Sequence, residues 1–295
     1  MALATTERTD TAYDDLDLWS DDRLVDAMAA SQRDALAPVS AASDAIGAAI
    51  RAVAAVLRAG GRLAYAGAGS SGLIAQLDRL ELPGTFGIPL ERLPLILAGG
   101  PAALAALSGE SEDDEAAGAA AVAEHGIWAG DALVGLSASG STPFTVAALR
   151  AAAERGAVTV GIACVAGSPL LAASRHAVAI GTPPEVLAGS TRLAAGTAQK
   201  CALNILSTGV ALRLGHGYRG LMVNMAPDNA KLKRRAVSIV ARAAGLAPER
   251  AEAALAAADG SIKVAVVLAG AGIGAEEARA RLARHGGDIR AALRA

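Results

Sequence analysis

The stretch of sequence that decides the fold is GGRLAYAGAGSSG, residues 60–72. Its residues 63–66 form a short apolar run typical of a buried strand. The segment Gly67-Ala68-Gly69-Ser70-Ser71-Gly72 follows at once and leads into a predicted helix. A strand, a glycine-rich turn and a helix N-terminus in this order indicate an anion-binding loop in a protein that mixes strands and helices.

Short apolar runs like this one recur along the chain and alternate with alanine-rich segments that are long enough for crossover helices. The runs cover residues 63–66, 93–97, 132–136, 157–163 and 177–180. The alternation predicts an α/β fold with a doubly wound parallel sheet, covered by helices on both faces. Ligands of such sheets bind beyond the carboxyl ends of the strands. Loops that follow strands are therefore the first candidates for a site.

Helical segments are predicted on both sides of the sheet region. Ser20 precedes an acidic first turn and is placed to cap a helix. A second helix, with Ile46 and Val53 on its apolar face, is predicted to stop at Gly60. Near the C-terminus, a basic start, KLKRR, precedes three short amphipathic segments at 248–258, 261–268 and 275–284. We expect N-terminal helices at 1–52, a sheet domain at 53–225 and a small helical domain at 226–295.

Composition narrows the possible functions. The 295 residues are 53% hydrophobic, which excludes a disordered chain. Only 2% of the residues are aromatic, so we expect no aromatic surface on which the bases of a nucleic acid could stack. The chain has 27 basic and 29 acidic side chains, so we expect no basic surface for a phosphate backbone either. Two cysteines without ligand spacing indicate neither a disulfide framework nor a zinc site. No segment resembles a signal peptide or a membrane span, and the expected location is the cytoplasm.

The first loop fits the dinucleotide pattern G-x-G-x-x-G, but that pattern also needs an acid after the next strand. At that place the chain has Ala98-Gly99-Gly100. The hydroxyls of Ser70 and Ser71, added to backbone N–H groups at a helix start, suit a small phosphate monoester better. The alternative is that these serines are only helix caps.

Further polar side chains follow other predicted strands. Residues 137–143, SASGSTP, follow the strand ALVGL, and Pro143 stands where a helix would begin. Two hydroxyl-rich loops at neighbouring strand ends can converge on one anion. A third segment, GSTR at 189–192, precedes a long helical stretch. Its hydroxyl groups could either cap that helix or bind a ligand. Glu185 is placed either to accept from a sugar hydroxyl or to face water. The candidate binding residues are Ser70, Ser71, Ser137, Ser139, Ser141, Thr142, Glu185, Ser190 and Thr191.

Acidic residues give the other chemical signal. Glu81 lies between Leu80 and Leu82, and a carboxyl group buried there would have a raised pKa and could act as a general acid. The run ESEDDE at 110–115 has the composition of a solvated helix start, and spacing does not single out Glu112 within it. The four histidines show neither metal nor triad spacing.

These segments, in this order, resemble the N-acetylmuramic acid 6-phosphate etherases, which are built on a sugar isomerase (SIS) domain. The resemblance runs nearly end to end, and its most specific block is PEVLAGSTRLAAGTAQK at 184–200. The other matching segments are TER at 6–8, GGRLAYAGAGSSG at 60–72, the Glu81 segment ending in TFG, LAGG at 97–100, SASGSTPF at 137–144, GSPL at 167–170, NILSTG at 204–209 and GLMVN…DNAKL at 220–232.

The resemblance implies an SIS-type αβα sandwich with a C-terminal domain similar to ubiquitin-associated domains, assembled as a homodimer. It also implies cleavage of the D-lactyl ether of N-acetylmuramic acid 6-phosphate, giving N-acetylglucosamine 6-phosphate and D-lactate during cell-wall recycling. The family's reaction is an elimination from the ring-opened sugar followed by addition of water. The family's acid falls on Glu81 and its second catalytic carboxylate on Glu112. Two carboxyls suffice, so neither a metal nor another cofactor is expected.

The chain departs from the family pattern at three basic positions, which here hold Leu73, Ser141 and Ala194. Loss of a guanidinium weakens recognition of a carboxylate, so a related phosphosugar or a different ether is an open alternative for the substrate. Two other functions also stay open. One is a non-catalytic phosphosugar sensor that resembles the glucokinase regulatory proteins, and the other is a phosphosugar isomerase.

Overall fold

The computed structural model describes residues 5–227 and 229–295. Contacts between residues divide the chain into two compact units. The first holds Met1–Arg79 and Glu91–Ser207, and the second holds Leu80–Leu90 and Thr208–Ala295. The predicted division at 1–52, 53–225 and 226–295 stays a prediction. Residues 1–4 of its first segment and Asp228 of the DNAKL motif lie outside the described residues.

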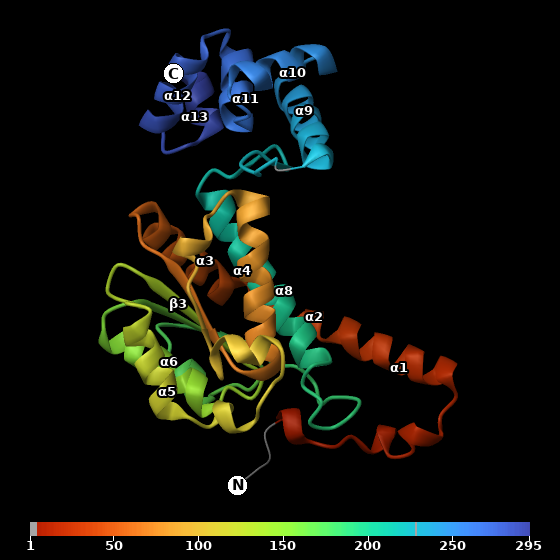
Figure 1. The fold of residues 1–295 in the computed structure, drawn as a ribbon. Coiled ribbons are helices and arrows are strands. Elements are labelled where there is room, and N and C mark those ends of the chain that lie inside the picture. The colour runs from red at the N-terminus through yellow and green to blue at the C-terminus, as the bar shows by residue number, and fades with distance from the viewer. Residues whose placement is uncertain (1–4, 228) are drawn as a thin grey trace. The chain divides into compact units, whose positions relative to one another are not determined.

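A five-stranded parallel sheet forms the centre of the first unit (Figure 1). Its strands are β1 (Leu63–Gly67), β2 (Leu95–Leu97), β3 (Ala132–Ser137), β4 (Val158–Ala163) and β5 (His176–Ala179), in the order β2-β1-β3-β4-β5. The predicted α/β fold with a parallel sheet is confirmed. Strand β1 pairs with β2 on one side and with β3 on the other, so the winding of the sheet reverses here. Such a reversal is where ligands bind in open α/β sheets.

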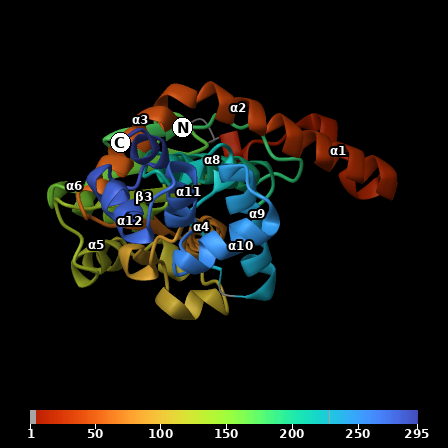
Figure 2. The same cartoon turned by 90° about the horizontal axis from the view of Figure 1, so that it is seen from above.

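Helices cover both faces of this sheet. Helix α3 (Ser43–Arg58) packs against β1, β4 and β5, whereas α6 (Pro143–Glu154) packs against β1, β3 and β4. Helix α5 (Glu115–Glu124) packs along α6, and the two views show α3 and α5 on opposite sides of β3 (Figure 1, Figure 2). The apolar face predicted for α3 is buried, including Ile46 and Val53.

Further helical elements occur in the first half of the chain and in the β4–β5 connection. They are η1 (Thr5–Glu7), η2 (Thr11–Tyr13), η3 (Leu16–Leu18), α1 (Asp21–Asp34), α2 (Leu36–Ala41), η4 (Leu90–Arg92), η5 (Gly100–Leu104), η6 (Glu110–Glu112) and α7 (Pro169–Ala172). Helix α1 begins directly after Ser20, as predicted, although the serine side chain makes no capping hydrogen bond.

Two long helices, α4 (Gly69–Phe86) and α8 (Ala194–Arg213), are joined within the first unit by a buried carboxylate. Asp78 on α4 accepts hydrogen bonds from the Tyr65 hydroxyl at 2.8 Å, Asn204 Nδ2 at 2.9 Å and Ser207 Oγ at 2.8 Å. Burial, followed by the charge of Asp78, holds the pKa of Tyr65 well above its usual range, so the phenol remains a donor. This carboxylate therefore ties strand β1 to both helices.

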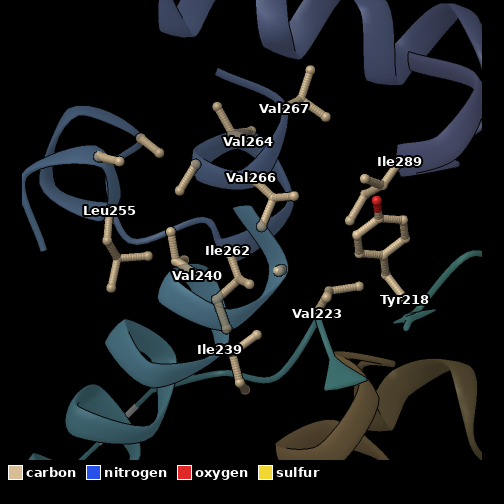
Figure 3. Close-up of a cluster of buried hydrophobic side chains, with 14 of the residues drawn as sticks. Tyr218, Val223, Ile239, Val240, Leu255, Ile262, Val264, Val266, Val267 and Ile289 are labelled. Atoms are coloured by element: carbon tan, nitrogen blue, oxygen red, sulfur yellow. The ribbon is translucent and has the colours of Figure 1, made fainter. Parts of the chain in front are cut away.

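The second unit contains a helical bundle and a short hairpin. Its helices after α8 are α9 (Ala230–Ala244), α10 (Pro248–Ala257), α11 (Ile262–Ala271), α12 (Ala275–Arg284) and α13 (Ile289–Arg294), and the hairpin pairs β6 (Gly217–Tyr218) with β7 (Leu221–Met222). The three predicted amphipathic segments form α10, α11 and α12. The sequence did not predict α13 or the hairpin. Valines and isoleucines from the helices pack around Tyr218 and Val223 in one core (Figure 3).

Candidate active site

The first glycine-rich loop joins β1 to α4 by a very close approach of the backbone. A Cβ on Gly67 would lie 2.8 Å from the Cα of Gly72, and a Cβ on Gly72 would lie 2.4 Å from a methyl group of Leu97. Only glycines fit here, and they let α4 begin immediately beyond the end of β1. Ser70 and Ser71 fall in the first turn of α4, where backbone N–H groups lack partners within the helix. The loop thus presents hydroxyls together with a positive helix end.

Glu112 lies against this loop. A Cβ on Gly69 would be 2.5 Å from Glu112 Oε1, so the carboxylate packs on the glycine backbone at the start of α4. Element η6, which carries Glu112, also packs against α6, the helix that follows the second serine-rich loop. Burial, followed by the charge of Asp113, raises the pKa of Glu112. The acidic run is therefore solvated only in part: residues 110 and 113–115 are exposed, while Glu112 turns inward.

The second loop is organised by its own hydroxyls at the end of β3. Ser137 Oγ lies 2.8 Å from Thr142 Oγ1 and accepts from the Gly140 N–H at 3.0 Å. Ser139 Oγ accepts from the Ser141 hydroxyl at 2.9 Å. Because β1 and β3 are parallel neighbours, with Gly67 in register with Leu136, the first and second loops leave the sheet at the same edge.

Sequence reasoning missed Ser168 as part of this edge. The GSPL segment that contains it follows β4, and a Cβ on Gly140 would lie only 2.1 Å from Ser168 Oγ. Gly140 has a φ of +68° and carries no side chain that would displace this hydroxyl. Ser168 Oγ is buried without a hydrogen-bond partner among the described residues. The signal available in the sequence was its position after a strand, in a segment already noted as a family motif.

Helix α8 contributes to the first loop through Gln199. The Ser71 hydroxyl donates to Gln199 Oε1 at 3.0 Å, which joins the start of α4 to the second turn of α8. The start of α8 is held by Glu185, whose Oε2 and Oε1 accept from the N–H groups of Ala194 and Ala195 at 2.8 and 2.9 Å. Glu185 is buried, so of the two alternatives that the sequence left open it does not face water, and its contacts place it at the N-terminus of α8.

Ser190 and Thr191 lie in the turn before α8, both half-buried. Neither serves as the cap of α8 that the sequence allowed, because Glu185 binds the first amide groups of that helix. The TER segment reaches the same turn: the Gly189 N–H donates to the Thr6 carbonyl at 3.2 Å. The N-terminal motif and the GSTR motif are thus neighbours in the folded chain.

Glu81 differs from its predicted environment. It is exposed in the structure, as is Leu80, whereas Leu82 is buried. The expectation that flanking leucines bury this carboxyl group is therefore wrong. Glu81 belongs to the second unit and lies ten residues beyond Ser71 on α4, nearly three helical turns along.

Other chemistry is sparse in the described part of the chain. Burial raises the pKa of the Cys164 thiol to about 12, which suppresses its thiolate. Within residues 5–227 and 229–295, no group of three or more His, Cys, Asp or Glu side chains is arranged to hold a metal ion. In the same residues no single helix is long and apolar enough to cross a membrane, while two bent helix pairs, Asp21–Ala41 with Ser43–Arg58 and Pro248–Ala257 with Ile262–Ala271, pass that test together.

Comparison with solved structures supports the fold. A phosphoheptose isomerase from Francisella tularensis superposes with a TM-score of 0.51, covering 66% of this chain and 100% of that chain at 21% sequence identity. At this identity the likeness concerns the fold alone. The family model described as "SIS domain" matches residues 28–164, which include both serine-rich loops.

Comparison with curated proteins is more specific. The chain is 45% identical to an N-acetylmuramic acid 6-phosphate etherase from Deinococcus radiodurans, over 88% of this chain and 85% of the relative. It is 45% identical to one from Rubrobacter xylanophilus over 88% and 86% of the two chains. It is also 43% identical to one from Mycolicibacterium smegmatis over 90% and 89%. This chain belongs to the N-acetylmuramic acid 6-phosphate etherase family.

Proposed function

We propose that this protein cleaves the D-lactyl ether of N-acetylmuramic acid 6-phosphate with water, giving N-acetylglucosamine 6-phosphate and D-lactate. The observation that carries the proposal is the position of Glu112, whose carboxylate packs on Gly69 beside the hydroxyls of the first turn of α4. A phosphate bound at the helix start would place the sugar next to a carboxylate with a raised pKa. A simple anion sensor has no need of such a base.

The chemistry proceeds by elimination and hydration. Glu112 removes the proton at C2 of the ring-opened sugar, and its raised pKa makes it a stronger base than an ordinary carboxylate. The C3–oxygen bond then breaks, and the lactate oxygen receives a proton from Glu81. Water adds to C3 of the unsaturated aldehyde, and a proton returns to C2, so the net change is the addition of one water. The role of Glu81 is supported by the family motif around it.

The phosphosugar is held by hydroxyls and backbone amides at the carboxyl edge of the sheet. The first-turn position of Ser70 and Ser71 supports phosphate binding. The shared strand edge supports a contribution from the second loop. The proposed binding residues are Ser70, Ser71, Ser137, Ser139, Ser141, Thr142, Ser190 and Thr191. Glu185 leaves this set because its oxygens hold the start of α8.

The protein is further proposed to be a cytoplasmic homodimer. The large apolar side chains of Leu73 and Leu77 lie four residues apart on α4 and are 38% and 44% exposed. Ile205 on α8 is 44% exposed as well. Exposed apolar side chains on two helices that are joined by hydrogen bonds support burial of these side chains against a second copy. The cytoplasmic location follows from the substrate, a charged phosphosugar of cell-wall recycling.

The decisive experiment incubates the full chain with N-acetylmuramic acid 6-phosphate in deuterated water and follows the products by NMR. D-lactate release with deuterium at C2 of the product is the expected result. Glu112→Gln should lower the rate by about 10²-fold or more, and Glu81→Gln should also lower it. The exposed neighbour Glu110→Gln is the matched control and should retain activity.

Three outcomes would overturn parts of the proposal. Binding of the phosphosugar without turnover would favour the sensor. Interconversion of sugars without lactate would favour the isomerase. A series of 3-O-ethers with and without the lactyl carboxylate tests the effect of Leu73 and Ser141. Equal rates for both kinds of ether would show that the carboxylate is not recognised.

A further inference from the structure

Gln199 forms an unusual contact behind the first serine-rich loop. Its side chain is 1% exposed, and Ser71, which is 9% exposed, donates to its Oε1 at 3.0 Å. The other end of the amide, Nε2, is buried and has no hydrogen-bond partner among the described residues. The oxygen of this carboxamide thus has a hydrogen-bond partner, whereas its nitrogen has none among the described residues.

An unpaired buried N–H group is rare in folded proteins, and its lost hydration destabilises the fold. The contact also constrains Ser71. A serine hydroxyl has one hydrogen, and that hydrogen is directed to Gln199 Oε1. The Ser71 oxygen can therefore only accept hydrogen bonds from a ligand at the loop and cannot donate one. An anion at the start of α4 would meet an acceptor where it needs a donor.

We propose that Gln199 is a positioning residue that reverses the hydrogen bond at Ser71 when the phosphate of the substrate binds. A half-turn of the carboxamide exchanges its oxygen and nitrogen without changing the shape of the side chain. The Gln199 N–H then donates to Ser71 Oγ, and the Ser71 hydroxyl donates to the phosphate. The inference rests on the proposed function in taking the anion to be that of a phosphosugar.

The surroundings of Gln199 suit such a reversal. Glu185 fixes the start of α8 through Ala194 and Ala195, so the backbone under Gln199 is held while the amide turns. The reversal replaces an unpaired N–H by an unpaired C=O, which proteins tolerate more readily. It also makes the hydrogen bond to the anion a charge-assisted one. The two orientations therefore differ in a way that the bound anion favours.

Glutamate at this position separates the reversal from a merely structural contact. A carboxylate keeps the acceptor for Ser71 but has no N–H to give back. If Gln199 serves only as an acceptor, Gln199→Glu will lose only the affinity that its added charge costs, which is measured by making Gln199→Glu in the Ser71→Ala background. If the amide must reverse, Gln199→Glu will bind at least about tenfold more weakly than that near neutral pH, because a hydrogen bond to a charged group is lost as well.

The measurement is isothermal titration of the full chain with N-acetylglucosamine 6-phosphate and with inorganic phosphate. The loss in Gln199→Glu should shrink as the pH falls, since a protonated carboxyl group can donate to Ser71 again. Under assay, KM for the etherase substrate should rise while kcat changes little. Gln76→Glu, half-buried on helix α4, which also carries Ser71, is the charge control and should bind like the wild type.

If Gln199→Glu does not fold, the uncharged variant Gln199→Met provides a second test. Gln199→Met should weaken phosphosugar binding in the wild-type background but not in Ser71→Ala, because both changes remove one shared interaction. Additive losses would overturn the inference, as would Gln199→Glu with wild-type affinity. Failure of the proposed function has a different signature, since the wild type would then bind phosphosugar without releasing lactate.

Discussion

At the scale of single residues, the charge of Asp113 adds to the effect of burial on the basicity of Glu112. This charge is the second cause, after burial, of the raised pKa of Glu112. A general base must be deprotonated to act, so the rate falls as the pH drops through its pKa. Asp113→Asn removes a like charge and lowers the pKa of Glu112. We expect the acidic limb of the kcat/KM profile to move to lower pH.

The control for this shift is Glu115→Gln, which removes an exposed charge from the same run. Burial and Asp113 are the causes that raise the pKa of Glu112, so Glu115→Gln should leave the limb in place. An acidic limb that stays fixed in Asp113→Asn, or that moves equally in both variants, would contradict Glu112 as the base.

Sequence patterns predicted neither the exposure of Glu81 nor the inward position of Glu112, and the reason is physical. Neighbours along a helix point in different directions, so Leu80 and Leu82 say little about the burial of Glu81 between them. The structure exposes Leu80 and buries Leu82. Glu112 was likewise indistinguishable within its acidic run, because its contact with Gly69 joins residues 43 positions apart. The family resemblance supplied Glu112, whereas Glu81 was also a candidate from its leucine neighbours, although for an environment that the structure does not show.

At the scale of elements, the central strands β1, β3 and β4 were predictable because they are buried on both faces and each reads as one apolar run. The same logic located α3 through its apolar face. Helix α13 and the β6–β7 hairpin were missed because elements of six and two residues are too short to show a period. The hairpin turn also uses Arg219, with a φ of +51°, where a turn pattern would predict glycine or asparagine.

The start of α8 gives a prediction at this scale. Removing the Glu185 carboxylate leaves the Ala194 and Ala195 N–H groups buried without their acceptors. Glu185→Ala should lower the free energy of unfolding by about 1–3 kcal/mol, measured by chemical denaturation. Glu185→Gln keeps one acceptor and should lose less, with phosphosugar affinity unchanged. Glu110→Ala, an exposed glutamate, is the control. A stable Glu185→Gln that no longer binds phosphosugar would return Glu185 to the ligand-binding set.

At the scale of the whole molecule, the net charge of −2 describes neither unit. The first unit carries 13 basic and 21 acidic side chains, whereas the second carries 14 and 8. The near-balance of the sequence therefore conceals an acidic unit that holds Glu112 and a basic unit that holds Glu81. Four basic side chains of the second unit, at residues 231 and 233–235, are exposed at the start of α9.

Assembly of the whole molecule is tested through the exposed leucines of α4. Leu77 is 44% exposed in the single chain, so a charge there costs the folded monomer little, whereas the same charge buried against a second copy is strongly unfavourable. We expect the wild type to be a dimer by light scattering after size exclusion, and Leu77→Glu to be a monomer that keeps the helical circular dichroism of the wild type. Leu18→Glu, at a position 77% exposed on η3, is the control and should remain dimeric. A folded Leu77→Glu that stays dimeric would move the interface away from this face of α4, and a monomeric wild type would remove the homodimer from the proposed function.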